Sequence, residues 1–183
     1  QDGKTTEKIE EPDNAEMLQD ILPQTGTANI EILKYADELM KKLYEEGWEY
    51  SNSRLIYHGD GTNTIETVEN NKNKVMNCAN VVNVTLKKAG ILTEEDLIKD
   101  GKGRFNPNIP DRVHGALKTK GWTKVNGGIE EMRPGDVIFY DGYKGHNSYG
   151  HVEIYAGLNE DGNPMFYSGE PSTIGKMPGV IVR

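Results

Sequence analysis

The spacing of the apolar residues changes about two thirds of the way along this 183-residue chain, and that change limits the folds open to it. Between residues 29 and 120, apolar side chains recur at three- and four-residue steps, which is typical of amphipathic helices. From residue 122 onward the chain consists of short runs rich in β-branched and aromatic residues, each bounded by turn residues. Helices followed by strands favour an α+β fold with an antiparallel sheet over alternating βαβ units.

The first part of the chain predicts three helices, at about residues 29–46, 78–89 and 111–120. Gly47 stands where the first helix needs a left-handed C-cap, and Asn77 is a suitable N-cap for the second. Thr93 and Asp96 have the spacing of a capping box, which predicts a short helix to about residue 99. Residues 48–74 are rich in Asn, Gly, Ser and Thr and are predicted to form a long loop.

The second part predicts five short strands, at residues 122–125, 136–140, 151–156, 164–168 and 180–183. The Asp161-Gly162 pair is a turn signal, so the strands on either side of it are expected to form a hairpin.

Charge and composition exclude several classes of protein. The chain has 29 acidic and 21 basic residues without a basic stripe, which argues against nucleic acid and anionic membranes as partners. No apolar run approaches the roughly 20 residues of a membrane span. Seven acids and two lysines fall within residues 1–22, so residues 1–26 are predicted to be an acidic linker or tail and residues 27–183 the folded domain.

The chain has a single cysteine, Cys78, which excludes an internal disulfide and every metal site built from several thiolates. Cys78 falls in the first turn of a predicted helix, where the partial positive charge of the N-terminus stabilises a thiolate. The amides of that turn can also donate to an oxyanion on an attacked carbonyl group. The position therefore suits a nucleophile.

A nucleophilic thiol needs a base, and His151 is the best placed of the four histidines. The other three lie in glycine-rich loops or in a short predicted helix: His58, His146 and His114. His151 begins a strand in which alternation puts its side chain on the same face as that of Glu153.

Three segments of the chain together resemble the NlpC/P60 cysteine peptidases. Residues 77–82, Asn-Cys-Ala-Asn-Val-Val, are similar to that family's Asp-Cys-Ser-Gly-Phe-Val nucleophile motif. Residues 132–140, Met-Arg-Pro-Gly-Asp-Val-Ile-Phe-Tyr, resemble its Leu-x-Pro-Gly-Asp-Leu-Val-Phe-Phe strand. Residues 150–157, Gly-His-Val-Glu-Ile-Tyr-Ala-Gly, resemble its Gly-His-Val-Gly-Ile-Tyr-x-Gly strand. The three motifs occur in the family's order, and the resemblance covers roughly residues 47–168.

The resemblance implies a papain-like α+β core in which the cysteine helix packs on an antiparallel sheet. It also implies that Cys78 attacks an amide, that His151 acts as general base, and that a third polar residue on the next strand orients the imidazole. Alignment of that strand puts Ser168 in the third position, with Tyr167 or Glu170 as alternatives if the register differs. Alternation places Ser168 and Tyr167 on opposite faces of the strand.

Two further residues are expected at the substrate. Residues 47–50, Gly-Trp-Glu-Tyr, resemble the family's Gly-x-x-Tyr segment, whose tyrosine lies beside the cysteine and contacts substrate; this implies that role for Tyr50. Asn77 replaces the family's aspartate before the nucleophile and is expected to border the substrate site while it caps the helix.

The resemblance implies a cell-wall hydrolase that cleaves an amide bond in peptidoglycan stem peptides, with no cofactor and no metal. We expect a secreted or cell-wall protein, and a monomeric domain of a longer chain. One alternative is an amidase or endopeptidase of the related CHAP group. Another is a non-catalytic module that binds cell-wall peptide on the same fold.

Overall fold

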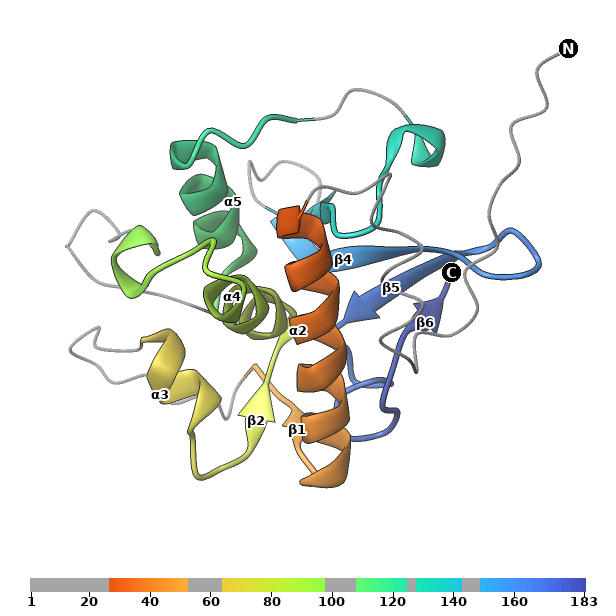
Figure 1. The fold of residues 1–183 in the computed structure, drawn as a ribbon. Helices are drawn as coiled ribbons and strands as arrows, with labels where there is room; N and C mark the ends of the chain where they lie inside the picture. Colours follow the sequence, from red (N-terminus) through yellow and green to blue (C-terminus); the bar gives the residue numbers. More distant parts are fainter. Residues whose placement is uncertain (1–26, 53–63, 98–107, 125–127, 143–148) are drawn as a thin grey trace, which may run out of the picture.

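The computed structural model describes residues 27–52, 64–97, 108–124, 128–142 and 149–183. The predicted linker at residues 1–26, and the histidines His58 and His146, lie outside these ranges. The described part contains four α-helices and a four-stranded antiparallel sheet (Figure 1), which confirms the α+β prediction. None of the helices in these ranges is long and apolar enough to cross a membrane.

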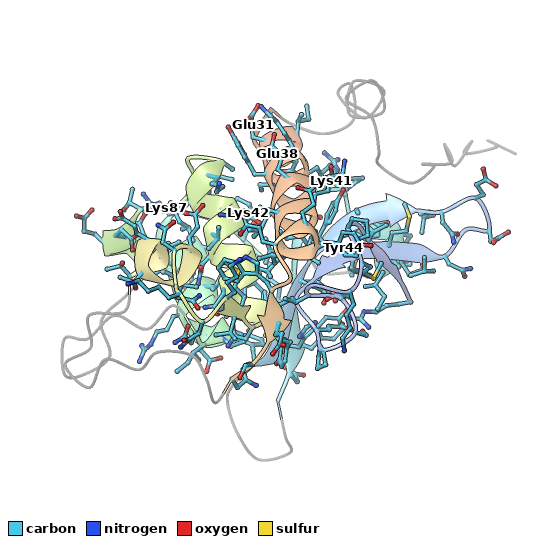
Figure 2. All side chains as sticks on the ribbon, turned by 90° about the horizontal axis from the view of Figure 1, so that it is seen from below. Glu31, Glu38, Lys41, Lys42, Tyr44 and Lys87 are labelled. Atoms are coloured by element: carbon cyan, nitrogen blue, oxygen red, sulfur yellow. The ribbon has the colours of Figure 1, made fainter. Side chains whose placement is uncertain are left out.

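Helix α2, Thr27–Glu45, follows the predicted amphipathic pattern. Its apolar side chains are buried in the core: Ile32, Leu33, Ala36, Leu39, Met40 and Leu43. The polar side chains of α2 that Figure 2 labels, which include Glu38 and Lys41, lie along the part of the helix outside this core. Gly47 has a φ of +67°, and the amide of Trp48 donates to the carbonyl of Leu43, so the glycine ends the helix as predicted.

Helix α4, Cys78–Lys88, lies at the centre of the molecule. Every side chain from Cys78 to Leu86 is buried, because the helix packs against α2, α3, α5 and the sheet. Helix α5, Pro110–Thr119, contacts both α4 and the sheet. The positions of both helices agree with those predicted.

The loop predicted over residues 48–74 contains regular structure. Strand β1, Glu49–Tyr50, pairs in parallel with β2, Val75–Met76, and helix α3, Ile65–Glu69, lies between them in sequence. Helix α3 is held by a capping box formed by Thr64 and Thr67. These elements are too short to produce a visible period in the sequence. The capping box at Thr93 is present, but it opens only a 3₁₀ turn, Glu94–Asp96.

The four-stranded sheet has the order β3-β4-β5-β6, with every neighbouring pair antiparallel. The strands are β3, Val137–Asp141, β4, Tyr149–Leu158, β5, Pro164–Ser168, and β6, Ile181–Val182. Gly162 takes a φ of +81° in the turn between β4 and β5, so the predicted hairpin is confirmed.

The strand predicted at residues 122–125 is wrong for the described residues 122–124. The amide of Trp122 donates to the carbonyl of Leu117, and Gly121 has a φ of +86°, so this segment closes α5. A 3₁₀ turn, Ile129–Glu131, precedes β3.

The two faces of the sheet differ in chemistry. Val152, Ile154 and Tyr167 point into the apolar core beneath the helices. Glu153 pairs directly with Ser168 across β4 and β5, and its side chain lies with those of His151 and Ser168 on the opposite face. Alternation along the strands therefore separates the core face from a face that is polar around His151.

Candidate active site

The first turn of α4 is pressed against the end of β5. A Cβ atom built on Gly169 would lie 3.0 Å from the Cα of Cys78 and 2.9 Å from the carbonyl oxygen of Asn77. Only a residue without a side chain fits this approach unless the backbone shifts. The close contact brings the predicted nucleophile to the strand end that carries Ser168.

The N-terminus of α4 is fixed by a reciprocal cap between two asparagines. The Oδ1 of Asn77 accepts from the amide of Asn80 at 3.0 Å, and the Oδ1 of Asn80 accepts from the amide of Asn77 at 3.0 Å. The Nδ2 of Asn77 donates to Asn52 and to the carbonyl of Asn108. Because Asn77 is only 3% exposed and its side chain is engaged within the protein, we assign it a structural role instead of the substrate contact that we expected.

Cys78 is 5% exposed and lies between two predicted site residues. Burial lowers the pKa of the His151 imidazole, whereas the thiol of Cys78 lies close enough to the ring to raise it. Burial is the largest cause of the raised pKa of the Tyr50 phenol. The hydrogen bond from Asn52 lowers this pKa, and the nearby Cys78 raises it further. The structure thus brings Cys78, His151 and Tyr50 together.

The other side of the imidazole faces a polar cluster. The Nε2 of His151 lies 2.9 Å from the Oγ of Ser168, 3.2 Å from the Oε2 of Glu153 and 3.5 Å from the Oε1 of Glu170. Since Nε2 is engaged there, Nδ1 is the nitrogen left for Cys78. Ser168 lies beside the imidazole, as the predicted register requires. The hydroxyl of the alternative residue, Tyr167, donates to Asp37 of α2 in the core.

The surroundings of His151 favour its protonated form. Burial of the ring disfavours the charge, but the interactions with Cys78 and Glu153 outweigh it and raise the pKa of His151 to about 9. The side chain of His151 keeps 25% of its surface exposed, so a ligand can reach it.

Glu153 is the site residue to which sequence reasoning gave no role. It is fully buried, and Arg183 holds its carboxylate with two hydrogen bonds, from Nε at 2.9 Å and from Nη2 at 2.5 Å. The hydroxyl of Tyr140 also donates to it. Burial opposes the charge, but the hydrogen bonds from His151, Arg183 and Tyr140 lower the pKa of Glu153 to about 2. The sequence contained one clue to this role. Position 153 is an acid on the same strand face as the imidazole, whereas the resembled motif has glycine at that position.

Three of these groups have the spacing of a cation site. Ligand atoms of His151, Glu153 and Glu170 lie within 4.8 Å of one another. The guanidinium of Arg183, however, bonds both carboxylates and supplies the positive charge between them. We therefore assign this cluster to an internal ion pair and not to a metal.

A pocket of about 430 Å³ opens beside the imidazole. Its lining includes Tyr50, Tyr140, His151, Glu170, Pro171 and Arg183. The pocket combines phenol rings with charged groups, so it suits a polar ligand such as a peptide.

No protein-family model matches this chain, and the comparisons with curated proteins and with solved structures found no match. The functional argument therefore depends on the geometry of the site and on the motifs of the sequence.

Proposed function

We propose that this protein is a cysteine amidase or peptidase in which Cys78 is the nucleophile and His151 the general acid and base. The observation that carries the proposal is the arrangement of one imidazole between a helix N-terminal thiol and a polar cluster. A thiol becomes an effective nucleophile when an adjacent imidazole takes its proton and a third group orients the ring.

The reaction would proceed by acyl transfer. The Sγ of Cys78 attacks the carbonyl carbon of the amide, and the protonated His151 gives its proton to the departing nitrogen as the C–N bond breaks. Water then attacks the thioester, His151 takes a proton from that water, and the acid is released with the thiol restored. The described site residues suffice for each proton transfer.

The oxyanion would be held by the start of α4. The cap uses the amide of Asn80, and the amide of Val81 bonds the carbonyl of Asn77 at 3.2 Å. This leaves the amides of Cys78 and Ala79, and that of Cys78 is the donor next to the attacking sulfur.

The proposed substrate is an amide bond in peptidoglycan stem peptides, and the fold is proposed to be papain-like. Both follow from the resemblance of residues 77–82, 132–140 and 150–157 to the NlpC/P60 motifs, and the pocket that Tyr50 lines is compatible with a peptide. Such an enzyme would act outside the cytoplasm. CHAP-type amidases use the same order of cysteine and histidine and are the nearest alternative.

The decisive experiment is digestion of purified bacterial peptidoglycan, followed by mass spectrometry of the new termini. We expect release of peptide fragments by the native chain and none by Cys78→Ser or His151→Ala. The matched control is His114→Ala, because His114 packs on Phe139 and Tyr149 and not at Cys78.

A non-catalytic binding module would give a different result. It would bind peptidoglycan without releasing fragments, and its Cys78 would react with iodoacetamide at the same rate with and without His151. An activated thiol requires the alkylation rate to fall in His151→Ala.

A further inference from the structure

Glu153 is the only charged residue with a buried side chain in the described ranges. A lone buried carboxylate costs several kcal/mol, so such a group persists only when strong partners surround it. Here its oxygens meet Arg183 twice, the hydroxyl of Tyr140 and the Nε2 of His151. The partners explain how the charge is tolerated. They do not explain why an acid stands there.

The position of Glu153 relative to His151 suggests a reason. Both residues belong to β4, two positions apart, so their side chains emerge on the same face and lie 3.2 Å apart at Oε2 and Nε2. Arg183 donates a hydrogen bond to each carboxylate oxygen of Glu153. These two bonds fix the plane of the carboxylate, so it has little freedom to move with the imidazole ring.

Ser168 meets the same nitrogen but differs in charge. Its Oγ is 2.9 Å from Nε2 and also lies 2.9 Å from the Oε1 of Glu170, to which it donates its proton. The hydroxyl oxygen can therefore accept from the imidazole. A neutral hydroxyl orients the ring, but it offers no counter-charge to an imidazolium.

We propose that Glu153 is a positioning residue for His151, holding the protonated imidazole with Nδ1 toward Cys78, while Arg183 fixes the carboxylate. The inference depends on the proposed function, because it assigns Glu153 to the same reaction. The groups facing His151 from the elements around it are Tyr50 of β1, Cys78 of α4, Tyr140 of β3, Glu153, Ser168, Glu170 and Arg183. Only Glu153 combines a full negative charge with complete burial, where solvent does not screen it.

The test compares Glu153→Gln with Ser168→Ala and Glu170→Gln by NMR titration of His151, which requires no substrate. Glutamine keeps the shape of glutamate and removes its charge, and Glu170 is a matched control because it also contacts Arg183 but is partly exposed. We expect the midpoint of the His151 titration to fall by about 1 to 3 pH units in Glu153→Gln. It should fall less in the other two variants.

Activity gives the second readout. We expect the basic limb of the kcat/KM profile to move to lower pH with the midpoint in Glu153→Gln, and kcat/KM to fall roughly 10- to 100-fold. Ser168→Ala should cost about 10-fold or less, because a neutral hydrogen bond contributes only ~1 kcal/mol. A role that is only structural would lower thermal stability without moving either pH dependence.

Two results would overturn the inference. One is an unchanged His151 midpoint in Glu153→Gln. The other is a larger shift in Glu170→Gln than in Glu153→Gln. A separate experiment tests the proposed function. If iodoacetamide alkylates Cys78 equally fast in His151→Ala and in the native protein, the proposed reaction is wrong, and Glu153 has no reaction to support whatever the titration shows.

Discussion

The contact between Gly169 and the first turn of α4 gives the sharpest prediction about the geometry of the site. In Gly169→Ala the new methyl group would lie 2.9 Å from the Asn77 carbonyl oxygen and 3.0 Å from the Cys78 Cα. Ordinary contacts begin near 3.4 Å, so the strand and the helix must separate by about 0.5 Å. These two atoms belong to the backbone and cannot rotate away, and the Cγ2 of Val81 lies equally close at 2.9 Å.

We expect two effects of this separation. Overpacking of this kind costs about 1–3 kcal/mol of unfolding free energy, and 2 kcal/mol would lower the Tm by roughly 4–8 °C in a chain of this size. The same shift moves Cys78 relative to His151. Because a 1 Å misplacement can cost about 100-fold in rate, half of that displacement should slow hydrolysis roughly 10-fold.

The assays are urea denaturation and the rate of the proposed peptidoglycan hydrolysis, with Gly115→Ala as the control. Gly115 lies in α5, where an added Cβ meets nothing within 4 Å, and alanine in a helix should add about 0.5–1 kcal/mol of stability. If Gly169→Ala matches the native protein in both stability and rate, the strand end does not press on α4 and the account of the site geometry is wrong.

The remaining predictions concern the two polar networks. Arg183→Met should lower the unfolding free energy by about 1–3 kcal/mol in urea denaturation at pH 7, because buried Glu153 loses both hydrogen bonds from the guanidinium. The pKa of Glu153 is lowered from 4.5 to about 2, so its contribution to stability is complete above pH 4.5 and is lost as pH falls toward 2. In Arg183→Met the folded-state pKa should rise, so the contribution should be smaller and its loss should be complete at a higher pH. Asn80→Ala should cost about 1–3 kcal/mol by removing the cap and the bond to Asn108, whereas exposed Asn70→Ala should change stability by less than about 0.5 kcal/mol.

The sequence predicted the parts of the fold that repeat a period over many residues. Helices α2 and α4 could be predicted because buried residues recur over several turns, on one side of α2 and on all sides of α4. Alternation also predicted that Ser168 shares a face with the imidazole, and the register of β4 and β5 agrees. Elements of two to five residues, such as β1 and α3, carry no such period, so the sequence predicts a loop where they lie.

The polar cluster behind His151 was only partly predictable, for a reason that lies in its connectivity. Arg183 is 30 positions from Glu153 in sequence and meets it only because the chain returns as β6 beside β5. Alternation along β4 predicts that the side chains of Glu153 and His151 share a face. It does not predict that the guanidinium of Arg183 lies beside them. A buried glutamate without such a partner is unfavourable. The sequence alone therefore points only to His151 as the functional residue of this strand.

The charges around His151 form a set whose members depend on one another. Burial alone disfavours both the imidazolium and the carboxylate of Glu153, yet the contacts between them shift each pKa toward the charged form. Arg183 adds a second positive charge and joins Glu153 to Glu170, so two acids face two cations before the thiol is counted. In the proposed reaction, a thiolate formed at Cys78 would add a negative charge on the other side of the ring. An imidazolium between two negative groups is stabilised from both sides, whereas a ring backed only by Ser168 would depend on the thiolate alone. This difference is the physical basis for expecting the loss of the Glu153 charge to change the pH dependence of the site, and the loss of the Ser168 hydroxyl to change mainly its rate.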